Sequence, residues 1–203
     1  MKPIAIALAM AFAATPALAQ TADETNCVSG DADARIAACS AVIQSGQETP
    51  VDQAVAYDNR SLAYRLQGKL DQAIDDAGKA IALDPDNAPA YLDRGIAYYA
   101  AKHYDLAIAD FTKVIALKPD YVAAYNDRGN AYDDSGDHDK AIADYSHALV
   151  LKPDYADAFV NRGSAYEEKK FNDYAISDYR SALKLDPNLQ PAKDGLKRLG
   201  DTP

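Results

Sequence analysis

The 203-residue sequence has no tryptophan, only two cysteines and only three histidines. Two cysteines are too few to build a small fold from disulfides, and His103, His138 and His147 are too scattered to predict a metal centre. Basic residues are also scarce, because 21 lysines and arginines stand against 31 aspartates and glutamates, a formal net charge of −10. A nucleic-acid binder needs a basic face, so we expect no nucleic acid as a partner.

Long apolar runs are missing except at the N-terminus. Residues 1–19 place Lys2 before an apolar run and end in Ala17-Leu18-Ala19. This order is typical of a secretory signal peptide, and the run is short for a membrane-spanning helix, the alternative interpretation. We therefore expect cleavage after Ala19, export to the periplasm, and no membrane insertion of the mature chain.

The remaining composition is that of a folded domain, with 48% hydrophobic and 26% charged residues. In an oxidising compartment Cys27 and Cys39 are expected to form a disulfide; their spacing is not the C-x-x-C of a redox pair, the functional alternative. The second cysteine falls in a predicted helix that Asp31 or Asp33 caps and Gly46 ends.

Several residue types recur every 34 residues, which indicates a repeat architecture. The recurring sets are Tyr57, Tyr91, Tyr125 and Phe159; Arg60, Arg94, Arg128 and Arg162; Ser61, Gly95, Gly129 and Gly163; Tyr64, Tyr98, Tyr132 and Tyr166; Ala73, Ala107, Ala141 and Ala175; Asp71, Asp105, Asp139 and Asp173; and Pro85, Pro119, Pro153 and Pro187.

Each unit is predicted to form two helices. The first, as in residues 88–100, places its aromatic, glycine and tyrosine positions on one face, at steps of four and three. The second, as in residues 104–117, is expected to be capped by Asp105 and stopped by Pro119. The small residues at Gly95 and Ala107 allow close helix packing. No single unit can bury its apolar face alone, so neighbouring units must stack.

This pattern resembles the tetratricopeptide repeat (TPR), with four copies over residues 54–187 (about 54–87, 88–121, 122–155 and 156–189). The resemblance implies an all-α, right-handed superhelical solenoid of helix-turn-helix repeats. The first copy departs from the family pattern with Ser61 for glycine and Ala77 for the second-helix aromatic. In the fourth copy Phe171 comes one position before the usual aromatic, so we expect a distorted turn there.

The resemblance also assigns the two ends of the chain. Residues 20–53 would be an N-terminal coil and capping helix, and within them residues 35–46 resemble a lone second helix with Cys39 at the Phe111 position. Residues 189–203 would form a solvating helix and tail, whose basic residues we expect to face water: Lys193, Lys197 and Arg198.

In such solenoids the first helix of each repeat lines a concave groove, and the resemblance supplies the candidate peptide-binding residues. They are Asp58, Asn59, Leu62, Arg65, Leu92, Asp93, Ile96, Tyr99, Asn126, Asp127, Asn130, Asp133, Asn161 and Glu167. With Asp134, Asp157 and Glu168 added, the groove holds eight acids against Arg65 alone. Acidic walls favour a cationic or neutral extended segment. The alternative is that these acids only keep the protein soluble.

Two recurrent columns receive specific interpretations. At the Asn59, Asp93, Asp127 and Asn161 column some family members use asparagine to bond the backbone of an extended ligand, because an amide both donates and accepts. The arginine column is interpreted as structural, with packed stems and paired heads. A binding role is its alternative.

The sequence therefore predicts a non-catalytic scaffold that binds protein or peptide and needs no cofactor. The alternative is a structural or assembly subunit of a cell-envelope complex that uses its convex face or its ends. No nucleophile and base are placed for catalysis. Residues 133–140 are rich in carboxylates but lack the spacing of a calcium loop, because Ala131 stands where an acid is required; Asp139 is expected to cap a helix instead. The oligomeric state is left open.

Overall fold

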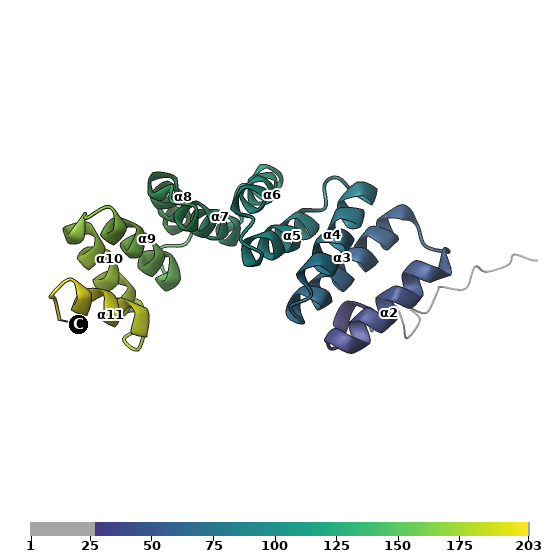
Figure 1. Ribbon diagram of the computed structural model, residues 1–203, viewed down its shortest axis with the longest axis horizontal. Coiled ribbons are helices and arrows are strands. Elements are labelled where there is room, and N and C mark those ends of the chain that lie inside the picture. The colour runs from purple at the N-terminus through teal and green to yellow at the C-terminus, as the bar shows by residue number, and fades with distance from the viewer. Residues whose placement is uncertain (1–26, 203) are drawn as a thin grey trace, which may run out of the picture.

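The structure is a computed structural model that describes residues 27–202, and the described chain is a row of helices without strands (Figure 1). The signal-peptide prediction falls on residues 1–19 and lies outside the described residues. The helices are α2 Ala32–Ser45, α3 Pro50–Leu66, α4 Leu70–Leu83, α5 Ala88–Ala100, α6 Tyr104–Leu117, α7 Val122–Asp134, α8 His138–Leu151, α9 Ala156–Glu168, α10 Asn172–Leu185 and α11 Gln190–Arg198.

The helices pack as consecutive pairs that form a solenoid. Helix α3 packs on α4, α5 on α6, α7 on α8 and α9 on α10, and each pair also contacts the next. The first helices contact one another along the row, α3 with α5, α5 with α7, and α7 with α9. The second helices of neighbouring pairs make no such contacts within residues 27–202. The first helices therefore lie on the inner side of the curve, and the predicted all-α repeat fold is confirmed.

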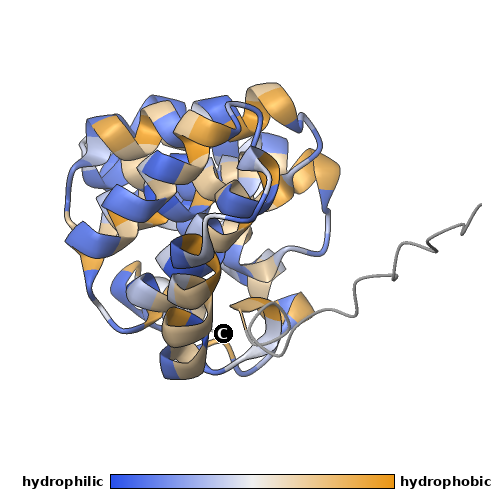
Figure 2. Cartoon of the chain, turned by 90° about the vertical axis from the view of Figure 1, so that its right-hand side faces the viewer, coloured by the Kyte–Doolittle hydropathy of each residue, from blue (hydrophilic) through white to orange (hydrophobic). Residues whose placement is uncertain are grey.

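Each helix carries both apolar and polar stretches, as amphipathic helices in a stacked array should (Figure 2). Apolar residues are buried between neighbouring helices in several small clusters along the row. Across residues 27–202, no helix is both long and apolar enough to cross a membrane.

The glycine column makes room for an aromatic ring from the second helix of the same pair. A Cβ on Gly95 would lie 2.7 Å from the Phe111 ring, and one on Gly129 would lie 2.6 Å from the Tyr145 ring. In the first pair the corresponding residues are Ser61 and Ala77, and the Ser61 hydroxyl donates to the Ala73 carbonyl at 2.8 Å. The two departures of the first repeat are therefore complementary, since the missing ring leaves space for the serine.

The turns between paired helices share one backbone geometry. The residue two before each second helix has a positive φ: Gly68 (72°), Lys102 (61°), Gly136 (90°) and Lys170 (63°). The predicted distortion of the fourth turn is wrong, because its φ matches that of the second turn. Phe171 fits by turning outward, with 48% of its surface exposed.

Two predicted helix caps are also wrong. The N-caps of α6 and α8 are His103 and Asp137. Asp105 and Asp139 are therefore the second residues of these helices, two positions after the caps. Asp137 is the residue whose side chain accepts a bond from the Lys140 amide. In the first turn the two displaced carboxylates still face the positive end of the helix dipole.

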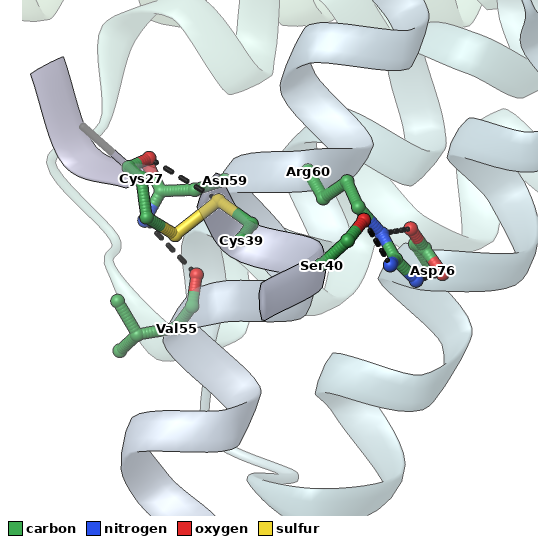
Figure 3. The surroundings of a disulfide bond; sticks show 7 residues. All are labelled: Cys27, Cys39, Ser40, Val55, Asn59, Arg60 and Asp76. Carbon is green, nitrogen blue, oxygen red and sulfur yellow. Dashed lines mark hydrogen bonds and ion pairs between the residues drawn. A yellow bond between two sulfur atoms is a disulfide. The ribbon is translucent and has the colours of Figure 1, made fainter. Parts of the chain in front are cut away.

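Helix α2 packs on α3 as the second helix of an incomplete repeat. Its N-cap is Asp31, whose side chain accepts from the Ala34 amide at 2.9 Å, and it ends at Gly46 with a φ of 64°. Cys27 and Cys39 are joined by a disulfide that ties the preceding segment to this helix (Figure 3).

Helix α3 begins at Pro50, four residues earlier than the repeat period predicts, so it is one turn longer than α5.

Candidate functional site: the inner face of the solenoid

The arginine column connects neighbouring helices and is structural, as its first interpretation predicted. Each arginine makes two bonds to an aspartate 16 residues later, and the atoms lie 2.6 to 3.0 Å apart. The pairs are Arg60–Asp76, Arg94–Asp110, Arg128–Asp144 and Arg162–Asp178. The aspartates are almost fully buried, so these guanidinium groups are already engaged and are poorly placed to bind a partner.

Three of the arginines, Arg60, Arg128 and Arg162, also bond a hydroxyl of the preceding second helix, and all four lie over an aromatic ring of their own repeat. The Nη1 of Arg128 donates to the Thr112 hydroxyl at 3.0 Å, and its guanidinium lies 5.8 Å from the Tyr125 ring and 5.9 Å from the Tyr132 ring. The same bond joins Arg60 to Ser40 of α2 (Figure 3). The aspartate column was not predicted from the sequence, although its members also recur at 34 residues: Asp76, Asp110, Asp144 and Asp178.

At the N-terminal end, the inner face carries both acidic and basic side chains. Arg65 bonds Asp93 at 2.9 Å. Asp58 is half-buried, and its Oδ1 has no hydrogen-bond partner within the described chain. Burial, and secondarily the charge of Asp93, raises the pKa of Asp58 to about 7 from the ordinary 3.8. Burial likewise raises the pKa of Asp127 to about 6. Asp58 is therefore only partly ionised near neutral pH, whereas Asp127 is mostly ionised there.

Several other candidates in this part of the face are used within the fold. The Asn59 amide donates to the carbonyl of Val55 in its own helix at 2.9 Å. Leu92, Ile96 and Tyr99 pack against the buried cluster around Phe111 and contribute to the core. Leu62 is half-buried, whereas Leu66 and Val55 on the same helix are 65% and 44% exposed, so an apolar surface remains open at this end.

In the C-terminal half, three asparagines and one tyrosine form a connected network. Asn161 donates to the Oδ1 atoms of Asn126 and Asn130, at 3.1 Å each, and the Tyr145 hydroxyl donates to Asn130 Oδ1 at 2.8 Å. Tyr145 belongs to α8 on the outer layer and reaches the inner face past Gly129. Tyr145 was not among the predicted site residues, although the spacing of 16 residues between glycine and aromatic was the available signal.

The remaining candidate carboxylates have partners of different kinds. Asp133 Oδ1 lies 2.7 Å from His138 Nδ1, and the Tyr99 hydroxyl donates to Asp134 at 2.6 Å. Burial is the main cause of a raised Asp133 pKa.

At the C-terminal end, the carboxylate of Glu167 is neutralised by a cation from the last helix. Arg198 of α11 makes two bonds to Glu167 at 2.9 Å, and the pairing lowers the Glu167 pKa. Arg198 is exposed, as expected, but it also pairs with Glu167, because α11 folds back beside α9 and brings the two groups together. The inner face is most negative at α7 rather than at the end of the row.

The arrangement can accept hydrogen bonds and attract positive charge, and it offers amide groups for polar backbone. Within residues 27–202, no group of three or more histidine, cysteine, aspartate or glutamate side chains is placed to hold a metal ion.

The fold and this inner face define an interaction scaffold built from helical-pair repeats. A family profile described as TPR repeat matches residues 62–102 and 129–170. Profiles described as Tetratricopeptide repeat match residues 88–121, 111–143 and 156–189. The chain belongs to the tetratricopeptide repeat family, whose members are typically non-catalytic scaffolds that bind proteins.

Solved structures share this architecture over most of the chain. Two crystal structures of MamA are similar, with TM-scores of 0.75 and 0.72 and sequence identities of 29% and 30%. They cover 83% and 81% of this chain and 96% and 88% of their own. YrrB, described as a TPR protein with an unusual peptide-binding site, has a TM-score of 0.71 at 20% identity, with coverage of 82% and 84%, which shows the fold alone. No curated protein matches the sequence.

Proposed function

We propose that this chain binds an extended protein or peptide segment, neutral or positively charged, along the inner face of α5, α7 and α9. The observation that carries the proposal is the concentration of carboxylates and amides on α7 and its neighbours. Asp127, Asp133 and Asp134 lie on this helix, and it has no lysine. A surface with these groups focuses a negative field on the partner and supplies acceptors for its backbone.

Substitutions that remove a negative charge from the inner face test the proposal. Asp127→Asn should weaken binding of a cationic segment about tenfold, because one charged hydrogen bond contributes roughly 1.5–3 kcal/mol. The segments would be selected from a random peptide library displayed against the purified protein and measured by isothermal titration calorimetry. Asn161→Ala is a less specific probe, since Asn161 also holds Asn126 and Asn130 in place.

The matched control is Asp154→Asn, which removes the same charge from an exposed residue in the loop before α9. It should leave affinity unchanged. If the selected segments bind the Asp127 variant and the parent protein equally well, the inner face is not the binding surface.

A second surface favours the alternative of an assembly subunit that binds through an edge. Tyr166, Phe171 and Tyr174 form a ring cluster with centroids 5.2 to 6.5 Å apart. Tyr174 and Phe171 are 64% and 48% exposed. A complex captured from the native host that survives Asp127→Asn but is lost with Tyr174→Ala would support this alternative.

Export to the periplasm belongs to the same proposal. The Cys27–Cys39 disulfide supports it, because an oxidising compartment maintains such bonds and the cytosol generally does not. Mass measurement of the protein from its native host, before and after reduction, should give a chain beginning at Gln20 that gains two hydrogens on reduction. A mass that includes residues 1–19 would contradict export by signal cleavage.

A further inference from the structure

A hollow of about 240 Å³ opens in the inner face where three repeats meet. Its walls are the side chains of Tyr99 on α5, Asn130, Asp133 and Asp134 on α7, Tyr145 on α8, and Asn161 and Ser164 on α9. In the function proposed above, this region acts only as a negative surface. The shape of the hollow and the hydrogen-bonding groups of its wall suit one particular kind of side chain.

The polar wall of the hollow is held in position by its own hydrogen bonds. Asn130 Oδ1 accepts from both Tyr145 and Asn161, so the orientation of that amide is set. Tyr99 donates to Asp134 Oδ2, and His138 contacts Asp133 Oδ1. A carboxylate offers about four acceptor sites in all. Asp133 and Asp134 can therefore each accept further bonds without giving up the existing ones.

The hollow is also negatively charged. Its seven lining residues, all in the described part of the chain, include two carboxylates and no lysine or arginine. The pKa of Tyr145 is raised, chiefly by burial and then by the charge of Asp133, and Asp134 also contributes. The nearest large cations on the inner face, Arg65 and Arg198, are already bonded to Asp93 and Glu167.

The wall of the hollow is almost entirely polar, because the Tyr145 ring is buried and its hydroxyl bonds Asn130. A guanidinium is planar and donates in a fork that matches carboxylate oxygens. A lysine ammonium is a compact, strongly hydrated charge that cannot form this fork. The adjacent carboxylates of Asp133 and Asp134 therefore favour arginine.

We propose that this hollow holds the guanidinium of one arginine side chain of the bound segment, an inference that rests on the function proposed above. Asp133 and Asp134 accept its N–H donors. The segment's backbone then runs along α7 in contact with Asn130 and Asn161. The arginine fixes the register of the segment on the inner face.

The test uses three blocked pentapeptides, acetyl-Gly-Gly-X-Gly-Gly-amide, with X arginine, lysine or citrulline. Each is titrated into the purified isotope-labelled protein and followed by amide NMR. The arginine peptide should shift the amide signals around residues 99, 130, 133, 134, 161 and 164. It should bind about tenfold more tightly than the citrulline peptide, which has the same shape without the charge. The lysine peptide should fall between them.

Variants of the protein provide the second arm. Asp133→Asn with Asp134→Asn should remove the preference for arginine over citrulline, whereas Asp154→Asn with Asp173→Asn, an equal charge change at exposed sites, should keep it. Equal affinity for arginine and citrulline in the parent protein overturns the inference, and this comparison does not depend on how well any variant folds.

The failure of this inference can be distinguished from failure of the proposed function. Library-selected segments that bind the inner face but keep their affinity when each arginine is changed to citrulline would leave the groove function standing and remove the arginine pocket. If no selected segment shifts inner-face signals, both are overturned.

Discussion

At the scale of single residues, the four arginine–aspartate pairs account for most of the recurrent charge in the chain. Each arginine holds its own second helix, and Arg60, Arg128 and Arg162 also hold the second helix before it through a hydroxyl. The aspartates are buried, so removing one partner leaves a charge without compensation. Losing one member of such a buried pair costs about 3–5 kcal/mol.

Arg128→Ala should therefore lower the free energy of unfolding by about 3 kcal/mol, since Asp144 would stay buried without its bidentate partner. Arg128→Lys should recover only part of this loss, because an ammonium cannot form the fork. Urea denaturation monitored by circular dichroism measures both. Removing Asp144 as well, by Asp144→Asn in the alanine variant, should restore some stability; a double variant as unstable as the sum of both losses would contradict the pairing.

Asp58 gives a pH-dependent prediction at the same scale. Its pKa rises from 3.8 to about 7 on folding, so between these values the folded protein keeps a proton that the unfolded chain has released. The contribution of Asp58 to stability is therefore full below about pH 4, declines as the pH rises to 7, and is lost above.

Asp58→Asn should stabilise the protein above pH 7, by no more than about 4 kcal/mol, and should have little effect near pH 3. Urea midpoints measured across this range test it, with Asp154→Asn as the exposed control. A titration of the Asp58 carboxyl carbon by NMR with a midpoint near 4 would show that burial does not act as described.

At the scale of helices, the pairing of a small residue with a ring sets how closely each first helix approaches its second helix. Gly95, Gly129 and Gly163 face Phe111, Tyr145 and Tyr179, and the last ring is also covered by Gly195 of α11. In the first repeat Ser61 and Ala77 replace both members at once. The exchange keeps the helix pair intact because the small Ala77 leaves room for Ser61, whose hydroxyl bonds the Ala73 carbonyl.

This complementarity predicts a non-additive pair of substitutions. Ala77→Phe alone should destabilise the protein by about 1–3 kcal/mol, because the ring would meet the Ser61 side chain in a packed core. Ser61→Gly with Ala77→Phe should recover most of that loss by restoring the arrangement seen at Gly95 and Phe111. A double-mutant cycle in urea measures the coupling. A coupling near zero would mean that the two sites adapt independently.

At the scale of the whole molecule, the solenoid has no central core, since each helix pair is stabilised only by its neighbours. Stability must therefore vary along the row and depend on the terminal elements. The N-terminal end is held by the disulfide and by Ser40 against Arg60. The C-terminal end depends on α11, where Leu196 is fully buried against the cluster around Tyr179.

Leu196→Ala should lower stability by about 2–5 kcal/mol, and the loss should be local. Hydrogen exchange should become faster in α9 and α10, while the amides of α3 to α5 should keep their protection. The control is Val150→Ala, at a site with 76% of its surface exposed, which should change neither region. Uniform loss of protection along the chain would indicate a single cooperative unit instead.

The sequence by itself determined the repeat, the helix pairs and the recurrent arginine positions, because local periodicity and the 34-residue spacing are properties of the chain. It also predicted that Asp31 or Asp33 caps α2 and that Gly46 ends it, since those residues act on backbone groups a few positions away; the structure selects Asp31. The cap assignments to Asp105 and Asp139 lie two residues after the observed caps, His103 and Asp137, a difference that such short-range reasoning does not resolve.

Only the tertiary structure decided which charges remain available on the inner face. Arg198 neutralises Glu167 across 31 residues, Tyr145 crosses from the outer layer to Asn130, and burial rather than residue type raises the pKa of Asp58. These outcomes depend on distances between helices and on the water excluded between them. A linear pattern fixes residue identity and spacing, but the electrostatic environment of a side chain is set by everything packed around it.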